Sequence, residues 1–174
     1  MPENCQIRSM TEADLPMVLA WRNHTEVRRF MLTQQEISLA EHTQWFASAV
    51  QDSTRRLLIV EEQGKPIGYV QFKGVAPGGI ADWGFYAHPD AAKGTGRKIG
   101  ESALEHAFAD LKLHKVCGQT IASNQASIRF HERLGFQREA ELRDQKRING
   151  AYHTLIGFGL LVNEWQEHTR GIPP

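Results

Sequence analysis

One run of the chain constrains the fold more than any other: residues 79–122 alternate strand, glycine-rich loop, long helix and strand. "GIADWGFYAHP" (79–89) is typical of a strand ended by Pro89, and "GRKIGESALEHAFADLK" (96–112) has the period of an amphipathic helix. "HKVCGQTIA" (114–122) again favours a strand. Strands that are joined through a helix lie parallel, because an antiparallel return needs only a short turn. The run therefore predicts a mixed sheet with one parallel crossing.

The chain before this run predicts one strand, two helices and a hairpin. The expected elements are a strand at 5–10, helices at 11–23 and 38–50, an irregular stretch at 27–37, and two strands in 55–75 around a Gly64-Lys65 turn. Both helices begin with a capping box, in which an N-cap hydroxyl residue and an acidic residue three positions later satisfy each other's backbone N–H groups. The capping residues are Thr11 with Asp14 and Ser38 with Glu41.

The chain after this run predicts a helix and a second hairpin. "NQASIRFHERLG" (124–135) has a helical period, and strands at 136–150 and 151–165 are expected to meet at a tight Asn149-Gly150 turn. With 174 residues and no repeat or linker, we expect one α/β domain over residues 1–174. Its mixed central sheet should have about seven strands, flanked by about four helices.

Composition excludes several classes of protein. Lys plus Arg equals Asp plus Glu at 20 each, which argues against a general nucleic-acid binder, since that would need a basic surplus. The two cysteines, Cys5 and Cys117, lack CxxC spacing, so we expect no metal site and no redox pair. The N-terminal stretch has no apolar core of secretory length, and no segment approaches a membrane span. We expect a cytoplasmic chain without a membrane partner.

The loop "DAAKGTGRKIG" (90–100) precedes the long helix and favours an anion. Gly94 and Gly96 let the backbone turn and approach a ligand closely, while the helix start presents N–H groups and a favourable dipole. Lys93, Arg97 and Lys98 add positive charge. The alternative is a strand-to-helix turn that is merely rich in glycine. A diphosphate held by backbone, with no evident magnesium ligands, favours a coenzyme over ATP.

Two segments together resemble the GCN5-related N-acetyltransferase (GNAT) superfamily. "KGTGRKIG" is similar to its diphosphate-binding motif and "NQASIRFHERLGF" to the next segment of that superfamily, in the right order. Ala91 stands where Gln or Arg is usual, but backbone amides do most of the binding there. The resemblance implies a sheet whose middle strands splay apart, with acetyl-CoA along the exposed strand edge.

Carried onto this chain, the resemblance implies a set of coenzyme-binding residues. The pantetheine would pair with the backbone of Phe85, Tyr86 and Ala87, and Asn124 would face the coenzyme arm. The diphosphate would lie on Lys93, Gly94, Thr95, Gly96, Arg97 and Lys98.

The resemblance also implies catalytic residues for direct transfer of the acetyl group. His131 stands where many members carry the tyrosine that protonates the departing thiolate, and an imidazole titrates near neutrality. It would then contact the sulfur end of acetyl-CoA; the alternative is a packing histidine. A strand-edge amide near Phe85 could stabilise the tetrahedral intermediate. Asp82 on the same strand could act as base, or be only a surface carboxylate.

The N-terminal third is expected to bind the acceptor. It combines basic and aromatic groups, which suit a nucleotide diphosphate through phosphate pairing and base stacking. The expected acceptor residues are Arg22, Asn23, Arg28, His42 and Trp45. The alternative is that the aromatic residues of this region pack its two helices together.

"WRNH", "VRRFM" and "EISLAEHTQWF" resemble the N-acetyltransferases of pseudaminic acid biosynthesis. This implies acetylation of the 4-amino group of UDP-4-amino-4,6-dideoxy-N-acetyl-altrosamine. The runner-up is an N-terminal acetyltransferase of the ribosomal-protein type, since parts of "WRN" and the C-terminal strand resemble that group too. A non-catalytic acyl-CoA sensor is the alternative from another class. The oligomeric state is left open, with a homodimer as one form.

Overall fold

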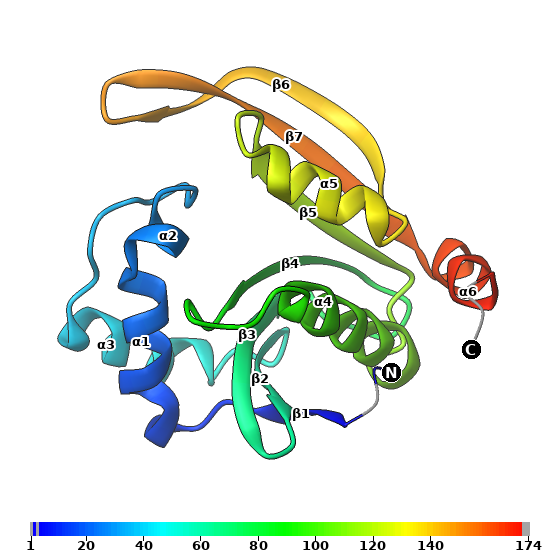
Figure 1. The fold of residues 1–174 in the computed structure, drawn as a ribbon, viewed down its shortest axis with the longest axis horizontal. Helices are drawn as coiled ribbons and strands as arrows, with labels where there is room; N and C mark the ends of the chain where they lie inside the picture. The colour runs from blue at the N-terminus through cyan, green and yellow to red at the C-terminus, as the bar shows by residue number, and fades with distance from the viewer. Residues whose placement is uncertain (1, 3, 172–174) are drawn as a thin grey trace.

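A single seven-stranded mixed sheet organises the computed structural model, which describes residue 2 and residues 4–171 (Figure 1). The strands are β1 (Cys5–Ser9), β2 (Arg55–Glu62), β3 (Lys65–Lys73), β4 (Ile80–Ala87), β5 (Lys115–Ile121), β6 (Gln137–Ile148) and β7 (Ala151–Leu161). Their order across the sheet is β1-β2-β3-β4-β5-β7-β6. The predicted α/β class and strand number are confirmed, while the ends of the expected domain at 1, 3 and 172–174 lie outside the described residues.

Helices cover both faces of this sheet. They are η1 (Glu12–Asp14), α1 (Leu15–Asn23), α2 (Thr25–Arg28), α3 (Leu39–Ala49), α4 (Thr95–Glu105), a π-helical turn η2 (His106–Asp110), α5 (Gln125–Arg133) and α6 (Val162–Arg170). Because side chains alternate along each strand, the sheet has a core cluster on each face. Val60 and Val70 share a cluster with Ile99 of α4, whereas Ile59 and Tyr69 pack with α1 on the opposite face.

The parallel crossing joins β4 to β5 over a short distance only. Their register pairs are Ile80 with Lys115, Ala81 with Val116, and Asp82 with Cys117. All other neighbouring strands are antiparallel. Beyond Asp82 the two strands diverge, and the sheet opens into a half built on β1–β4 and a half built on β5–β7 (Figure 1).

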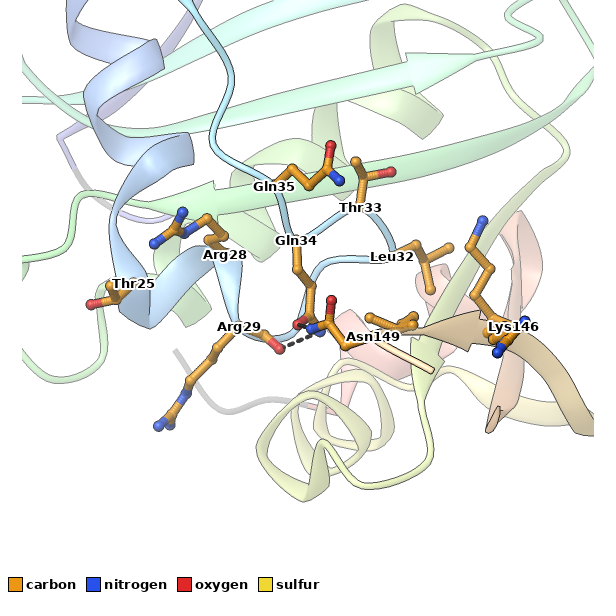
Figure 2. A pocket seen from close by; sticks show the side chains of 11 residues that line it. Thr25, Arg28, Arg29, Leu32, Thr33, Gln34, Gln35, Lys146 and Asn149 are labelled. Carbon is orange, nitrogen blue, oxygen red and sulfur yellow. Dashed lines mark hydrogen bonds between the residues drawn. The ribbon is translucent and has the colours of Figure 1, made fainter. Parts of the chain in front are cut away.

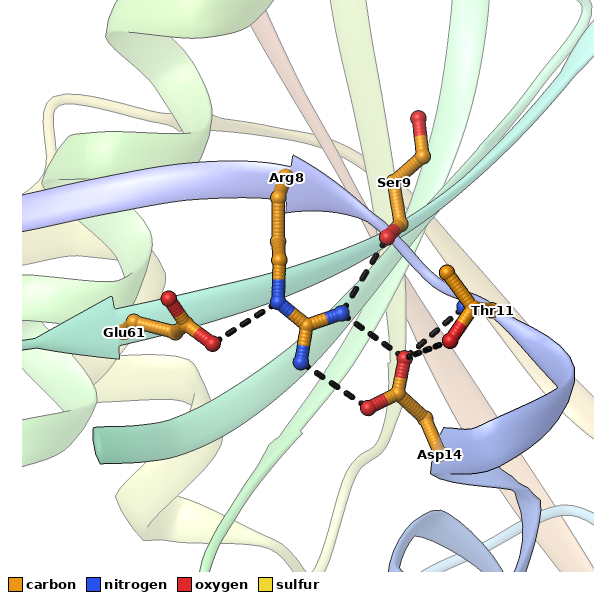
Figure 3. A network of polar contacts seen from close by, with 5 residues as sticks. All are labelled: Arg8, Ser9, Thr11, Asp14 and Glu61. Carbon is orange, nitrogen blue, oxygen red and sulfur yellow. Dashed lines mark hydrogen bonds and ion pairs between the residues drawn. The ribbon is translucent and has the colours of Figure 1, made fainter. Parts of the chain in front are cut away.

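Both predicted capping boxes are present, and one belongs to a wider polar network (Figure 3). The Asp14 carboxylate accepts from the Thr11 backbone N–H at 2.8 Å and from both terminal nitrogens of Arg8 at 2.8 and 2.9 Å. The Nε of Arg8 also donates to Glu61 at 2.7 Å. Arg8 thereby lowers the pKa of Asp14 and ties the start of the first helical segment to β1 and β2.

The two hairpin turns were predicted with different success. Asn149-Gly150 forms the expected turn, with φ of +50° and +82°. The first turn lies one residue earlier than expected, at Gln63-Gly64 with φ of +51° and +76°, because Glu62 pairs with Lys65. Both residues of such a turn need positive φ, and a side chain at Lys65 would have been strained there.

The prediction of a strand through Trp165 was wrong. β7 ends at Leu161, whose N–H donates to the Glu164 carboxylate at 2.9 Å, and this cap begins α6. Trp165 is then buried with its ring 6.3 Å from that of Phe108. The apolar residues end at Val162, and the polar pair Asn163 and Glu164 marks the change from strand to helix. α2 was also missed, since residues 27–37 were expected to be irregular.

No helix among residues 4–171 is both long and apolar enough to cross a lipid bilayer.

Candidate active site

A cavity of about 720 Å³ opens where β4 and β5 part. Its walls come from the end of β4, the end of β5, the first two turns of α5, and the segment from the end of α1 to Thr33. The sheet itself supplies the floor through Tyr69 and Gln71 of β3. The cavity therefore exists because a parallel pair stops after three residues, which leaves no strand to fill the gap.

The cavity passes through the sheet from one face to the other. Phe85 points toward α5, with its ring 4.9 Å from that of Phe130. Its neighbour Tyr86 points to the opposite face, with its ring 4.9 Å from that of Tyr69. Because side chains alternate along a strand, β4 has wall residues on both faces of the sheet. A molecule on the α4 and α5 face can thus meet a second molecule on the α1 face.

The edge of β4 faces this opening. Phe85, Tyr86 and Ala87 pair with β3 on one side, opposite Val70, Tyr69 and Gly68. The pairing of β4 with β5 ends at Asp82, so the other side of these three residues lines the cavity. An extended chain can lie along such an edge and bond its backbone.

The glycine loop forms the start of α4. Gly94 is its N-cap with φ of +92°, a conformation that favours glycine, and Thr95 is the first helical residue. A Cβ added at Gly96 would lie 3.9 Å from the nearest atom, in Phe130, so the approach to this residue is open. Such a helix start presents unpaired N–H groups, which suits a phosphate.

The charged side chains of this loop are mostly engaged with carboxylates. Arg97 donates to Glu101 at 2.6 Å, and Lys98 is paired with Glu62. Lys93 is exposed. The positive charges expected at the anion site are present, but two are shared, so the backbone carries most of the attraction.

Asn124 holds the start of α5 in the cavity wall. Its side-chain oxygen accepts from the Ser127 N–H at 3.1 Å as the N-cap of the helix. That bond occupies the oxygen and leaves the amide N–H₂ as the group that can meet a ligand.

His131 lies in the same wall and is 3% exposed. Its Nδ1 is 2.8 Å from the Ser127 carbonyl oxygen and its Nε2 is 3.2 Å from the indole Nε1 of Trp83. Because an indole N–H only donates and a carbonyl only accepts, the ring carries its proton on Nδ1 and accepts at Nε2. Burial lowers the pKa of His131 below its ordinary 6.5, which favours this neutral form.

The expected acid role of His131 does not match this arrangement. Nε2 has no proton, and the proton on Nδ1 is directed at the backbone rather than at the cavity. The ring also stacks on Phe158 at 4.7 Å and 9°. In this structure His131 supports Trp83 and the α5 wall.

Asp82, the expected base, lies at the closed end of the β4–β5 pair. Its side chain is exposed, and it is absent from the cavity lining. The carboxylate that does line the cavity is Glu26 of α2, which lies 3.5 Å from Arg29. Sequence reasoning missed Glu26, although it follows the distinctive "WRNHT" directly.

Arg22 is the most unusual residue of the acceptor-side wall. It is 6% exposed, and one terminal nitrogen donates to the Thr33 carbonyl oxygen at 2.5 Å. The other, Nη1, is buried without a hydrogen-bond partner in the part of the chain that the structure describes. Burial, and then the positive charge of Arg28, lower the pKa of Arg22, while the nearby Tyr86 opposes the shift. A buried guanidinium in this state favours an anion.

Only Arg22 of the five expected acceptor residues lines this cavity; Arg28 does not, and neither do Asn23, His42 and Trp45. The Asn23 side chain donates to and accepts from the backbone of Ile37 at 2.7 and 2.8 Å, which ties α1 to the segment before α3. His42 is 4% exposed and stacks on Trp45 at 5.2 Å. These side chains serve packing between α1 and α3, which was the alternative that the sequence left open for the aromatic residues.

Similarity to known proteins agrees with this geometry. Residues 5–137 match the family described as "Acetyltransferase (GNAT) domain". The acetyltransferase PseH of Campylobacter jejuni is 24% identical over 134 residues, which cover 75% of this chain and 83% of that protein. The spermidine N(1)-acetyltransferase of Escherichia coli is 24% identical over 162 residues, covering 92% and 87%.

The fold is shared with solved structures as well. The crystal structure of spermidine N-acetyltransferase from Vibrio cholerae in complex with CoA and spermine superposes with a TM-score of 0.86. The sequence identity is 22%, and the match covers 94% of this chain and 98% of that one.

Proposed function

The chain belongs to the GNAT acetyltransferase family and is an acetyl-CoA-dependent N-acetyltransferase; we propose that its acceptor is an amino sugar linked to UDP. Specifically, we propose the 4-amino group of UDP-4-amino-4,6-dideoxy-N-acetyl-altrosamine, as in pseudaminic acid biosynthesis. The observation that carries this proposal is the buried Arg22. This residue lines the cavity, and its Nη1 lacks a partner among residues 4–171.

Acetyl-CoA is proposed to enter from the α4 and α5 face. Its pantetheine would pair with the free edge of β4 at residues 85–87, and its diphosphate would lie on the backbone of residues 93–98. The open space over Gly96 and the left-handed Gly94 support this placement, because both allow close approach to backbone N–H groups. The amide N–H₂ of Asn124 would meet the coenzyme arm.

The proposed reaction is direct transfer. The neutral amine attacks the thioester carbonyl, the C–N bond forms, the C–S bond breaks, and the amine loses a proton to a base. Glu26 is proposed as that base, acting through water, since it lines the cavity whereas Asp82 does not. An amide at Phe85 on the β4 edge is proposed to stabilise the oxyanion.

His131 is proposed to position the thioester rather than to protonate the thiolate. Its two ring nitrogens are bonded to Ser127 and Trp83, and burial lowers its pKa. The thiolate would then take its proton from water.

The charge of the acceptor wall discriminates between the relatives. A polyamine carries several positive charges and would meet the like charges of Arg22 and Arg28, with Glu26 as the one carboxylate of the cavity lining. A nucleotide diphosphate supplies negative charge at that place. The likeness to PseH supports the same choice, and the likeness to spermidine acetyltransferases supports the shared fold.

A panel of acceptors tests the proposal. The purified protein with acetyl-CoA should release free thiol with UDP-4-amino sugars and at most slowly with spermidine, ribosomal-protein N-terminal peptides or the free amino sugar. Faster turnover of spermidine or peptide would contradict the proposed acceptor. Tight binding of acetyl-CoA without turnover of any amine would favour the sensor.

A further inference from the structure

A second cavity lies beside the first, between the segment after α1 and the tip of the β6–β7 hairpin (Figure 2). Its volume is about 570 Å³. One wall is formed by residues 25–35 and the other by residues 146–149. The two walls are more than a hundred residues apart in the chain, so only the folded protein creates this cavity.

Positive charge lines both walls. Arg28 and Arg29 lie on the wall that starts with α2, and Lys146 and Arg147 lie on the hairpin wall. No Asp or Glu belongs to this lining, although Glu26 lies 3.5 Å from Arg29 at its margin. Four cationic side chains around one hollow, with one outlying carboxylate, produce a positive potential that favours a multiply charged anion.

The hairpin wall is held in place. Ile148 is buried against Ile121 and Leu155 at the base of the tip. The Asn149 side chain donates to the Gln34 side chain at 3.3 Å, and Gln34 in turn donates to the Arg29 carbonyl oxygen at 2.7 Å (Figure 2). The bond between Asn149 and Gln34 joins the two walls, while the side chains of Lys146 and Arg147 are exposed and the Arg147 guanidinium lies over the ring of Tyr152.

The two cavities are neighbours that share part of their lining. Leu32 and Thr33 line both of them, and Thr33 accepts the hydrogen bond from the buried Arg22. Arg22, on the first cavity, and Arg28, on the second, are close enough for their charges to oppose each other. An anion between them would remove that repulsion and supply the partner that Nη1 of Arg22 lacks.

We propose that this second cavity binds the nucleoside diphosphate end of the acceptor, with Lys146 and Arg147 of the hairpin contacting its phosphates. The inference rests on the proposed nucleotide-linked acceptor and assigns its distal end to a site of its own. The amino sugar would occupy the first cavity, and the diphosphate would run past Arg22 and Arg28. The side-chain amide of Gln35, which has both a donor and an acceptor, matches a pyrimidine edge.

Calorimetry with UDP, inorganic pyrophosphate and CoA tests this site. Arg147→Ala should raise the Kd for UDP by roughly threefold to tenfold, since each partly exposed phosphate contact contributes modestly. Lys146→Ala should act similarly, and pyrophosphate should bind more weakly than UDP but respond to the same variants. Arg143→Ala is the matched control, because Arg143 is an exposed arginine of the same hairpin outside the lining. CoA should not displace UDP. The Kd for CoA should be the same in these variants as in the wild type.

The outcomes separate this inference from the proposed function. Suppose that a UDP-amino sugar is acetylated and that its KM is the same for Arg147→Ala as for the control Arg143→Ala. The hairpin subsite is then overturned and the proposed function stands. Displacement of UDP by CoA, or no measurable heat with UDP, would also overturn the subsite. If UDP binds and both hairpin variants weaken it, yet no UDP-amino sugar is acetylated, the subsite stands and the function falls.

Discussion

Arg22 and His131 stand in opposite walls of one cavity and are nearly equally buried, at 6% and 3% exposure. His131 has a partner for each ring nitrogen and a neutral ring. Arg22 has a charge, one bonded terminal nitrogen, and an Nη1 without a partner among residues 4–171. The wall on α5 is therefore complete without a ligand, whereas the wall on α1 is not.

This difference teaches how to separate structural from ligand-binding polar residues. Unpaired polar groups are costly to bury, so a protein that retains one usually gains from it elsewhere. His131, which the resemblance makes a candidate catalytic residue, has both ring nitrogens bonded within the protein. Arg22 lines the cavity and has an Nη1 without a partner among the described residues; His42 Nε2 and Ser102 Oγ also lack a partner there, but neither residue lines the cavity. Substitution of Arg22 should therefore affect mainly the use of the substrate, whereas substitution of His131 should affect mainly the stability of the protein.

The largest effect is expected from Arg22→Met. Loss of a buried guanidinium that meets phosphate should raise the KM for the UDP-amino sugar by about ten- to a hundredfold, as for a hydrogen bond to a charged group. The KM for acetyl-CoA and the thermal midpoint should change little, because no carboxylate is left unpaired. Arg22→Lys is the control, which keeps the charge and should recover part of the loss. A change in the KM for acetyl-CoA alone would show that Arg22 does not bind the UDP-amino sugar.

Gly96→Val should produce the next largest effect, on the coenzyme wall. The new side chain has space in the protein, since the nearest atom to its Cβ is 3.9 Å away, but it would block approach to the backbone N–H groups. We expect the Kd for acetyl-CoA to rise by about tenfold, the loss of one or two charged contacts. Calorimetry of a folded variant measures this, with Gly96→Ala as the smaller control. Unchanged affinity would contradict the coenzyme placement.

His131→Phe sharpens the comparison from the other side. It removes the acceptor for the Trp83 N–H, so stability should fall by about 1–3 kcal/mol, measured by urea denaturation. The fall in kcat should stay below the roughly 10²-fold loss typical of a lost acid catalyst. His131→Tyr should then match His131→Phe in kcat. A tyrosine variant that keeps nearly full kcat while the phenylalanine variant loses about 10²-fold would instead support proton donation.

The smallest effect is a pH dependence of stability. Burial lowers the pKa of both His131 and His42 below 6.5, so the unfolded chain binds protons more readily than the folded one. Stability should therefore be full above pH 6.5 and decline as the pH falls below it, by at most about 1.4 kcal/mol per pH unit for each group. His131→Phe should show a shallower decline than the wild type in urea denaturation at pH 7.5 and 5.5. A parallel decline would contradict the buried neutral ring.

Much of the fold could be predicted because its signals are local. The capping boxes at Ser38 and Thr11, the Asn149-Gly150 turn and the helix that begins at the glycine loop each depend on a few neighbouring residues. Sequence reasoning failed at the boundary between β7 and α6. The apolar run ends at Val162, and Asn163 and Glu164 before Trp165 belong to the first turn of α6, where Glu164 caps the helix and Trp165 packs near Phe108.

The candidate site divides in the same way. The loop proposed to bind the coenzyme could be read from the sequence, because its shape depends on the backbone freedom of Gly94 at the start of α4. The acceptor side is made of side chains whose role depends on direction. By residue type alone, four residues are equally good candidates for binding the acceptor: Arg22, Asn23, His42 and Trp45. Only Arg22 of these four lines the cavity.

The parallel crossing, the helix starts at Thr11 and Ser38 and the glycine loop before α4 could be read from the sequence, since hydrophobic period, capping and glycine freedom act over a few residues. Only the tertiary structure decided that β4 and β5 part after Asp82, that both nitrogens of His131 are occupied, and that Lys146 lies across a hollow from Arg28. These facts depend on distances between segments far apart in the chain. No local propensity encodes such a distance, because it results from how the whole core packs.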